Sequence, residues 1–304
     1  MYDWAITQRV ATPCSKDRKV LNILGLKEPT PKEFARKLLG AAWQRAPRRT
    51  RWRFLSGLLG LEPDLCKQQM GIPSMWGALE LLARNGINPG TVIDVGAWRG
   101  EWAHRAAGIF KNSRFLLLEA NPDHEPSLRE LCSRHPGIDY RLALLGAKPR
   151  SAVTFHIPSE LAIRGGSQGG SIFPEVTAFP QLTKKLPMVV LDDVAHDLAG
   201  PLLVKLDVQG SELEVMAGGR EVLARSDALV VETALIEYNA KAPQFAEVIS
   251  QSAAHGFVCY DIGGQFRRNE DSALFQVDLV LVRESSLLRS PRRFWATEQS
   301  FRRH

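Results

Sequence analysis

The sequence predicts an α/β fold with a mostly parallel sheet, an antiparallel last strand and an N-terminal helical extension. From Thr91 onward, short apolar runs alternate with segments of helical spacing. This alternation builds a parallel sheet with right-handed crossovers. Near the C-terminus, the apolar runs 257–262 and 275–282 are separated only by a short, polar, glycine-bearing segment. No crossover helix fits between them, so we expect the final strand to run antiparallel to its neighbours.

Composition limits the class of protein. A chain of 304 residues has room for one large α/β domain and an appendage, and 44% hydrophobic with 24% charged residues is ordinary for a soluble globular protein. No apolar run is long enough to be a transmembrane segment, and no signal-peptide pattern is visible. The cysteines are scattered without a Cys-x-x-Cys pair, which argues against a zinc knuckle and favours a reducing, cytoplasmic compartment. They are Cys14, Cys66, Cys132 and Cys259.

We expect three segments: a helical N-terminal extension over 1–85, the α/β domain over 86–285, and a basic C-terminal tail over 286–304. The extension and the tail carry most of the arginines behind the net charge of +6. Such clusters bind RNA or an anionic surface in some proteins, but solvated arginines are the simpler interpretation, and no RNA-binding signature accompanies them. A homo-oligomer that forms through the helices of the extension is also compatible with the sequence. Helices are expected over 31–46, 51–61 and 74–85.

Within the α/β domain, each element follows from its local pattern. Buried parallel strands are apolar runs, and helices follow them with apolar residues three or four apart. A Gly/Ser-rich stretch, 164–171, is expected to be a loop that either closes over a substrate or lies free at the surface. The expected strands are 91–95, 114–119, 138–144, 152–157 at an edge, 189–191, 202–207, 228–232, 257–262 and 275–282. The expected helices are 100–110, 123–134, 192–198, 211–223 and 245–255.

The stretch from Thr91 to Gly100 is the strongest local signal for a ligand. A β-branched run ends at Asp94-Val95, and the turn between Gly96 and Gly100 opens a helix. Glycines allow the backbone to approach a ligand where a Cβ would collide. Glu119 ends the second strand, where an acid can accept both ribose hydroxyls of an adenosine. A tight turn without a ligand is the alternative, because a two-glycine turn is a weak signal alone.

Three blocks of sequence resemble the FkbM-type S-adenosylmethionine-dependent methyltransferases. They are Val92 to Gly100 with Glu119 to Pro122; Leu191-Asp192-Asp193 with Val204 to Glu214; and Gly256-Phe257 with Gln276 to Val280. The lysine-bearing strand that runs into Asp207-Val208-Gln209-Gly210 is the most specific part. Two positions depart from the family pattern: Trp98 replaces a frequent asparagine, and Ala120-Asn121-Pro122 replaces a Glu-Pro continuation.

The resemblance implies a Rossmann-like methyltransferase sheet and S-adenosyl-L-methionine as cofactor. The loop after the first strand would pass under the cofactor, and Asp94 would orient that loop or reach the methionine ammonium through water. Glu119 would take the ribose, and Leu142 and Ala143 would border the adenine. The expected cofactor-binding residues are Asp94, Gly96, Ala97, Trp98, Gly100, Glu119, Ala120, Asn121, Leu142, Ala143 and Asp207.

The resemblance also implies O-methylation of a sugar, glycan or natural-product hydroxyl, so the acceptor is a small molecule or a glycan. Asp207, at the tip of a central strand, is the first candidate to accept the hydroxyl proton. The alternative is that Asp207 binds backbone amides of the 208–211 turn and caps the next helix. Glu212 and Glu232 are second candidates. His156 is a further candidate base, although a histidine in a strand is more often a bystander.

Other interpretations of the same residues carry less weight. Asp192, Asp193, Asp207 and Glu232 could gather a divalent ion, but the first two can equally start a helix, and we favour a metal-free site. Lys205 is expected to form an ion pair at an edge or end of the sheet and is given no catalytic role. A methyltransferase-fold binding module would be expected to lose one of the acids that are intact here. A nicotinamide-dependent reductase is disfavoured by the missing third glycine.

Overall fold

The computed structural model describes residues 64, 67, 72–159, 169–176, 180–268 and 270–289. The chain divides into two compact units, residues 1–77 with 291–304, and residues 78–290. The second unit contains the α/β domain. The helices expected over 31–46 and 51–61 lie outside the described residues, as do the arginines of the extension and the tail other than Arg84 and Arg289. The proposed boundaries near residues 85 and 286 stay predictions.

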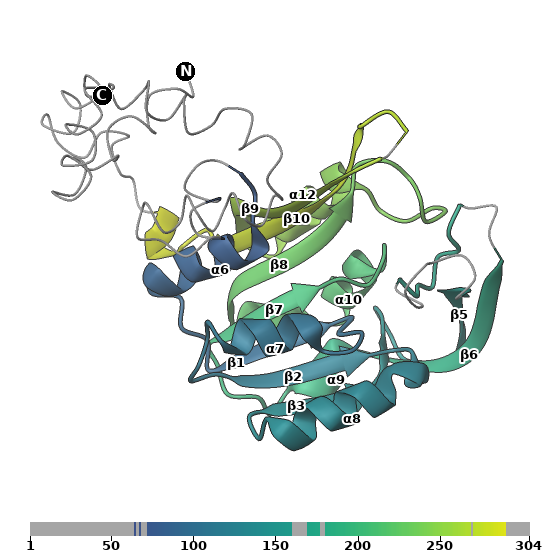
Figure 1. Ribbon diagram of the computed structural model, residues 1–304, viewed down its shortest axis with the longest axis horizontal. Helices are drawn as coiled ribbons and strands as arrows, with labels where there is room; N and C mark the ends of the chain where they lie inside the picture. The colour runs from purple at the N-terminus through teal and green to yellow at the C-terminus, as the bar shows by residue number, and fades with distance from the viewer. Residues whose placement is uncertain are drawn as a thin grey trace, which may run out of the picture. The chain divides into compact units, whose positions relative to one another are not determined.

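In the described part of the chain, the main sheet has seven strands in the order β3-β2-β1-β7-β8-β10-β9 (Figure 1). The first five strands in this order run parallel to one another, and β10 runs antiparallel to both of its neighbours. The expectation of an antiparallel last strand is therefore confirmed, and this strand lies between β8 and β9. The strands are β1 Thr91–Val95, β2 Arg114–Glu119, β3 Ile138–Leu142, β7 Leu202–Leu206, β8 Ser226–Ala234, β9 Phe257–Arg267 and β10 Leu274–Arg283.

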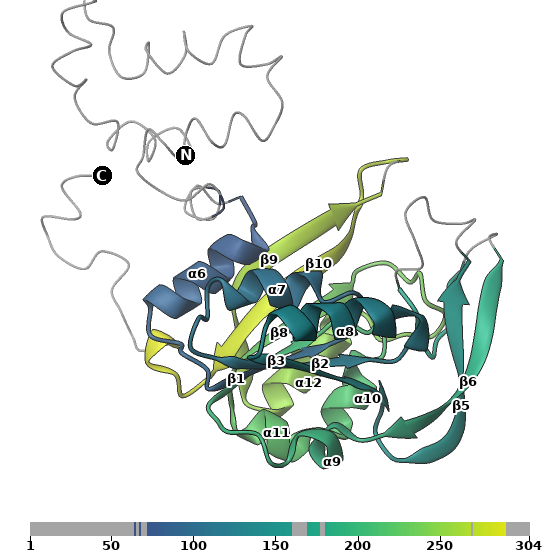
Figure 2. The same cartoon turned by 60° about the horizontal axis from the view of Figure 1, so that its bottom comes forward.

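Helices cover both faces of this sheet. Figure 2 shows α7 (Glu101–Ala107) and α8 (Glu125–Arg134) on one face, with the helices that follow β6 on the other. All five positions of β1 and of β7 are buried, as expected for central parallel strands covered on both sides. The helices of the second face are α9 Leu191–Ala195, α10 Glu212–Ala217, α11 Arg220–Ala224 and α12 Phe245–Ala254.

The helix expected over 211–223 is wrong as a single element, because it breaks between α10 and α11 at Gly218-Gly219. A Cβ on Gly218 would overlap the carbonyl oxygen of Gly146. The backbone of the break therefore packs directly against the chain after β4 (Leu144–Leu145), a contact that only glycine permits.

Helix α6 (Met75–Arg84) agrees with the helix expected over 74–85. The hydroxyl of Ser74 accepts a hydrogen bond from the backbone N–H of Gly77 at 3.4 Å, and Gly86 ends the helix with φ +99°. Its residues Ala78, Leu79 and Leu82 are completely buried. None of the described helices has the length and apolar character needed to cross a membrane.

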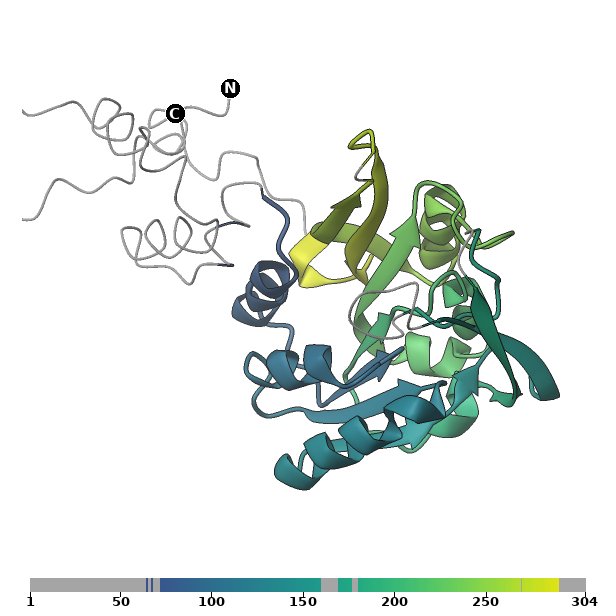
Figure 3. The same ribbon diagram turned by 45° about the vertical axis from the view of Figure 1, so that its right-hand side comes forward.

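A second sheet is present that the sequence patterns do not predict. Among the described residues it contains three strands in the order β4-β6-β5, where β5 is Arg150–Pro158 and β6 is Gln181–Val189 (Figure 3). The strand expected over 138–144 ends at Leu142, and β4 pairs with β6 in the second sheet instead. The strand expected over 152–157 belongs to this sheet too, not to an edge of the main one. The strand expected at 189–191 is wrong, because β6 ends at Val189 and α9 begins at Leu191. The sequence did not predict β6, because its exposed polar residues interrupt any apolar run.

Candidate functional site

The loop after β1 is shaped by the protein around it. Gly96 and Gly100 have φ +79° and +81°, the left-handed region that favours glycine. A Cβ on Gly96 would overlap the carbonyl oxygen of Asp207, and one on Gly100 would overlap the side chain of Leu131. The approach of the Asp207 backbone already requires glycine at 96 without a ligand, and the positive φ favours glycine at 100.

Glu119 ties this loop to the end of β2. Its Oε2 accepts a hydrogen bond from the backbone N–H of Trp98 at 2.7 Å, and its Oε1 accepts one from the N–H of Asn121 at 2.8 Å. His124 Nδ1 lies 3.4 Å from the same Oε1, and Glu119 is only 7% exposed. A carboxylate has about four lone-pair sites, so Glu119 retains capacity for further donors.

Trp98 stands out within the loop. It has φ +51°, although it is not glycine, and the indole lies edge-on to the His124 ring with centroids 6.3 Å apart. Its Nε1 is buried and finds no hydrogen-bond partner among the described residues. An unpaired buried donor costs stability unless a further group satisfies it, which fits a place where a polar ligand binds.

Leu142 and Ala143 also lie beside Glu119. The backbone N–H of Ala143 donates to the Glu119 carbonyl at 2.8 Å, and Leu142 is an exposed apolar side chain at the end of β3. The second sheet approaches from the same side, because Lys184 on β6 lies 2.7 Å from Asp123 and 3.3 Å from Asn121 Oδ1. The expected cofactor residues of β1, β2 and β3 are thus neighbours at the carboxyl edge of the main sheet.

An ion-pair triad joins β1 to the end of β7, with Lys205 and Asp94 buried and Asp207 partly exposed. Lys205 Nζ lies 3.0 Å from Asp94 Oδ1 and 3.1 Å from Asp207 Oδ2. Burial raises the pKa of Asp94, and Lys205 acts against that rise. Burial lowers the pKa of Lys205, but the charges of Asp207 and Asp94 outweigh it and raise the pKa overall. Contrary to the expected edge or end position, Lys205 lies on a central strand, where its charge needs these partners.

Asp207 connects this triad to β8 through Gln209. The Gln209 carboxamide nitrogen donates to Asp207 Oδ1 at 3.0 Å and to Glu232 Oε1 at 2.6 Å, and its oxygen accepts the hydroxyl of Tyr238. Burial, with Asp207 and Asp278 nearby, raises the pKa of Glu232 well above its usual value. Asp278 on β10 pairs in register with Glu232, and burial raises its pKa to about 6.

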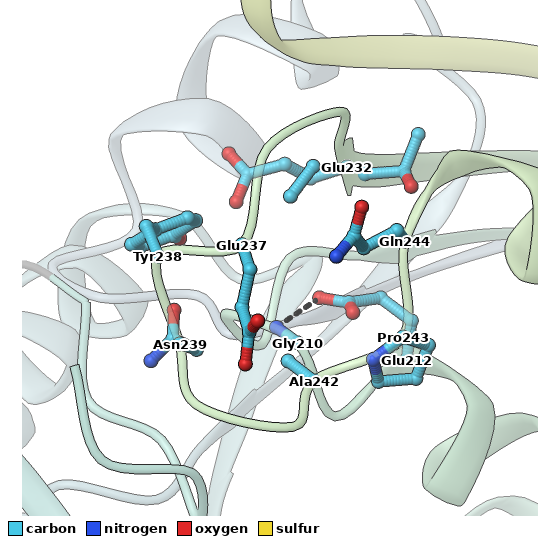
Figure 4. Close-up of a pocket in the computed structure, with 11 residues that line it drawn as sticks. Gly210, Glu212, Glu232, Glu237, Tyr238, Asn239, Ala242, Pro243 and Gln244 are labelled. Atoms are coloured by element: carbon cyan, nitrogen blue, oxygen red, sulfur yellow. Dashed lines mark hydrogen bonds between the residues drawn. The ribbon is translucent and has the colours of Figure 1, made fainter. Parts of the chain in front are cut away.

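Glu212, rather than Asp207, binds the backbone amides of the turn after β7. Its Oε1 accepts hydrogen bonds from the backbone N–H groups of Val208 and Gly210, both at 3.1 Å. The side chain is almost completely buried, and burial raises its pKa to about 7. Figure 4 shows the contact with Gly210. Glu212 therefore holds the turn after β7, whereas the Asp207 side chain is 31% exposed.

A small pocket lies between the turn after β7, the end of β8 and the start of α12 (Figure 4). Its interior has room for roughly one water molecule. Thr233 Oγ1 and Asn239 Oδ1 are buried in its wall and have no hydrogen-bond partner among the described residues. The lining residues are Gly210, Glu212, Glu232, Thr233, Ala234, Glu237, Tyr238, Asn239, Ala242, Pro243 and Gln244.

His156 lies on β5, in the second sheet. Its backbone pairs with Ser171 through hydrogen bonds of 2.7 and 2.9 Å, and Ser171 Oγ donates to the Gln209 carbonyl at 2.7 Å. The Asn239 carboxamide donates to the Phe173 carbonyl at 3.0 Å. The described part of the Gly/Ser-rich stretch therefore lies against the loops after β7 and β8. The contacts that join His156 to this region are made by its backbone.

Asp192 is committed to the helices. Its carboxylate accepts hydrogen bonds from the backbone N–H groups of Glu221 and Val222, at 3.1 and 2.9 Å, at the start of α11. It therefore caps a helix, although α11 rather than the helix that it was expected to start. Among the described residues, no group of three potential ligands has a geometry that would hold a metal ion.

Sequence reasoning missed Gln209, Tyr238 and Asn239 as site residues. Gln209 was visible as part of the Asp-x-Gln-Gly turn, which could have suggested it. Tyr238 and Asn239 lie in an irregular loop after β8 with no periodicity or motif, so no local signal indicated them.

Comparison with known proteins agrees with this arrangement. A family model described as the methyltransferase FkbM domain matches residues 94–259, more than half of the chain. No curated protein matches. Among solved structures, a precorrin-6y C5,15-methyltransferase from Geobacter metallireducens is 11% identical, with 68% of this chain and 87% of that chain covered and a TM-score of 0.38. A 1,6-didemethyltoxoflavin-N1-methyltransferase from Burkholderia thailandensis, with S-adenosylhomocysteine bound, is 11% identical, with 69% and 78% covered and a TM-score of 0.36. Likenesses at this level carry no inference about activity.

The family match covers the loop after β1, the acid of β2, and the segment from Lys205 to Glu212. The cofactor of this family is S-adenosylmethionine, and the residues at the carboxyl edge fit it: a carboxylate with spare acceptor capacity beside an unpaired buried indole N–H. The chain therefore belongs to the FkbM family of S-adenosylmethionine-dependent methyltransferases.

Proposed function

We propose that this enzyme methylates a hydroxyl group of a sugar, a glycan or a natural-product metabolite, with Asp207 as the acceptor of the hydroxyl proton. One observation carries the proposal. The carboxylate of Asp207 lies at the carboxyl end of the central strand β7, beside the loop after β1, and is partly exposed, whereas Asp94 and Glu212 are buried. Of these three acids, Asp207 is therefore the one that a methyl acceptor can reach.

The cofactor is held by the residues around β1, β2 and β3 in this proposal. Glu119 would accept the ribose hydroxyls, the backbone of the Gly96–Gly100 turn would hold the amino-acid end, and Leu142 with Ala143 would border the adenine. Asp94 is completely buried and paired with Lys205, so its part is to orient the loop. S-adenosylmethionine supplies a methyl carbon on a positively charged sulfur, which keeps the C–S electron pair when the acceptor oxygen bonds to the carbon.

Asp207 takes up the proton that this transfer releases. As the acceptor oxygen forms its bond to carbon, its proton moves to a carboxylate oxygen of Asp207, and the product is an uncharged methyl ether. Lys205 Nζ lies 3.1 Å from Asp207 Oδ2 and orients the carboxylate that takes up this proton. Proton transfer by a positioned side chain contributes typically about 10²–10⁴-fold to rate.

The experiment is a transfer assay with tritium-labelled methyl donor and a panel of acceptors: neutral methyl glycosides, nucleotide sugars, catechols, an amino sugar and a thiol. We expect label in a base-stable methyl ether from a hydroxyl acceptor. The Asp207→Asn variant should lose about 10²–10⁴-fold in kcat and keep its affinity for S-adenosylhomocysteine. Asp197→Asn, an exposed acid, is the matched control.

Transfer only to an amine or a thiol would contradict O-methylation. Asp207→Asn with the turnover of Asp197→Asn would remove Asp207 from the mechanism. We further propose the cytoplasm as the location, on the cysteine usage; Cys132 and Cys259 are both free thiols in the described part of the chain.

A further inference from the structure

The side chain of Gln209 joins three groups. One nitrogen, Nε2, reaches two carboxyl groups, Asp207 on the loop after β7 and Glu232 on β8. The carboxamide oxygen accepts the hydroxyl of Tyr238, which lies in the loop after β8. A carboxamide has two N–H donors and an acceptor oxygen, so these contacts use all of its functions.

Only one orientation of the carboxamide satisfies these neighbours. Turning it over would place its oxygen against the carboxylate of Asp207, which repels it, and would leave Asp207 Oδ1 without this donor. Burial and the surrounding carboxylates raise the pKa of Tyr238, so its hydroxyl stays protonated and donates to Gln209. Tyr238 therefore selects the orientation in which the nitrogen faces Asp207.

The backbone of Gln209 is fixed as well. Gln209 has φ +53°, a conformation that is unfavourable for a residue with a Cβ, and Gly210 follows with φ +96°. Its carbonyl accepts the Ser171 hydroxyl at 2.7 Å, and Glu212 holds the N–H groups on both sides of the residue. A strained residue that is held from several sides is typical of functional turns.

The result is a carboxylate held at both oxygens. Asp207 Oδ2 faces Lys205 at 3.1 Å, and Asp207 Oδ1 accepts from Gln209 at 3.0 Å. Gln209 also places a neutral donor group between Asp207 and Glu232, where direct contact of two carboxyl groups would favour protonation of one of them. The titratable and charged groups around Asp207 are Asp94, Lys205, Glu212, Glu232, Tyr238 and Asp278.

We propose that Gln209 is a positioning residue that fixes the carboxylate of Asp207 for catalysis, and that Tyr238 sets the orientation of the Gln209 carboxamide. The inference rests on the proposed function of Asp207 as proton acceptor. It assigns a role to the glutamine of the Asp-x-Gln-Gly turn and to a tyrosine outside every sequence motif considered above.

The first test follows Asp207 directly and needs no acceptor. In protein labelled with ¹³C at the aspartate carboxyl groups, the Asp207 signal is assigned by its loss in Asp207→Asn and titrated by NMR. Gln209→Glu replaces the donor with a carboxyl group, so we expect the Asp207 titration to move to higher pH by about 1 unit or more. Tyr238→Phe should move it in the same direction by less. Gln251→Glu, an exposed position on α12, is the matched control.

The second test uses the hydroxyl acceptor found by the panel. Gln209→Glu should lower kcat at least about 10-fold, with the acid limb of the kcat/KM profile at higher pH and with unchanged affinity for S-adenosylhomocysteine. An Asp207 titration and a kcat equal to those of Gln251→Glu would overturn the inference. If Gln209→Glu does not fold, Tyr238→Phe decides by the same two readouts. An inactive Asp207→Asn with a normal Gln209→Glu refutes only this inference, whereas an active Asp207→Asn refutes the proposed function.

Discussion

Lys205 and Asp94 face each other across the two central strands, with Nζ 3.0 Å from Oδ1 and their backbones in register between β7 and β1. Both side chains are buried, with 7% and 0% exposed. The pair joins the first and the second of the sequence blocks that resemble the family. It also fixes the base of the loops that carry Gly96 and Asp207, so the stability of the fold and the geometry of the site share one interaction.

Lys205→Met should destabilise the protein by about 3–5 kcal/mol, because it leaves the buried carboxyl group of Asp94 without its cation. Urea unfolding measures this loss. Lys148→Met, on an exposed lysine, should change the free energy of unfolding by less than about 0.5 kcal/mol. The double variant Lys205→Met/Asp94→Asn should recover part of the loss, because the unpaired charge is gone. Equal stability of Lys205→Met and Lys148→Met would show that the pair contributes nothing.

Glu212 should make the protein less stable as the pH rises from about 4.5 to about 7. Its pKa in the folded state is raised to about 7, so over this range the folded state holds a proton that the unfolded state has released. Removing the charge with Glu212→Gln keeps the acceptor oxygen for Val208 and Gly210. This variant should therefore be more stable than the wild type at pH 8, by of order 1–3 kcal/mol, and have a shallower pH dependence.

Urea unfolding of wild type and Glu212→Gln at pH 5, 6.5 and 8 tests this. Glu130→Gln, on an exposed acid of α8, is the control and should follow the wild-type curve. Parallel curves for wild type and Glu212→Gln would contradict the expected role of burial.

Glu119→Gln should weaken binding of S-adenosylhomocysteine by at least about 10-fold, because the ribose would lose a charged acceptor. The variant keeps one acceptor oxygen, so part of the contact with Trp98 and Asn121 can persist and the fold should survive. Isothermal titration calorimetry measures the affinity, again with Glu130→Gln as the control. Undiminished affinity in a folded Glu119→Gln protein would move the ribose contact to another residue.

Gly96→Ala should cost far more stability than Gly86→Ala, although both positions have positive φ. A Cβ added to Gly86 would meet no atom within 4 Å, so this variant carries only backbone strain of about 1–2 kcal/mol. A Cβ added to Gly96 would also overlap the Asp207 carbonyl oxygen. We expect a loss above about 4 kcal/mol or failure to fold, measured by thermal and urea unfolding. Similar losses in the two variants would mean that the β1 and β7 loops separate easily.

Local sequence patterns predict the strands of the main sheet, because buried parallel strands are apolar runs and the helices between them have helical spacing. The runs at 91–95, 114–119 and 202–207 agree with β1, β2 and β7 within a residue, and the short polar link before β10 predicted its direction. The same patterns placed Asp94, Glu119 and Asp207 at strand ends, where the carboxyl edge of a sheet brings them together. The second sheet was not predicted, because the half-exposed strand β6 lacks an apolar run.

The roles of the individual site residues depend on contacts that form only in the folded protein. Whether Asp207 or Glu212 caps the turn after β7 depends on which carboxylate the fold points at the amides, and both lie within the same six residues. The contact of Gln209 with Glu232 and Tyr238 joins segments more than 20 residues apart. Hydrogen bonds and ion pairs of this kind depend on distances across the fold, and a sequence pattern records only spacing along the chain.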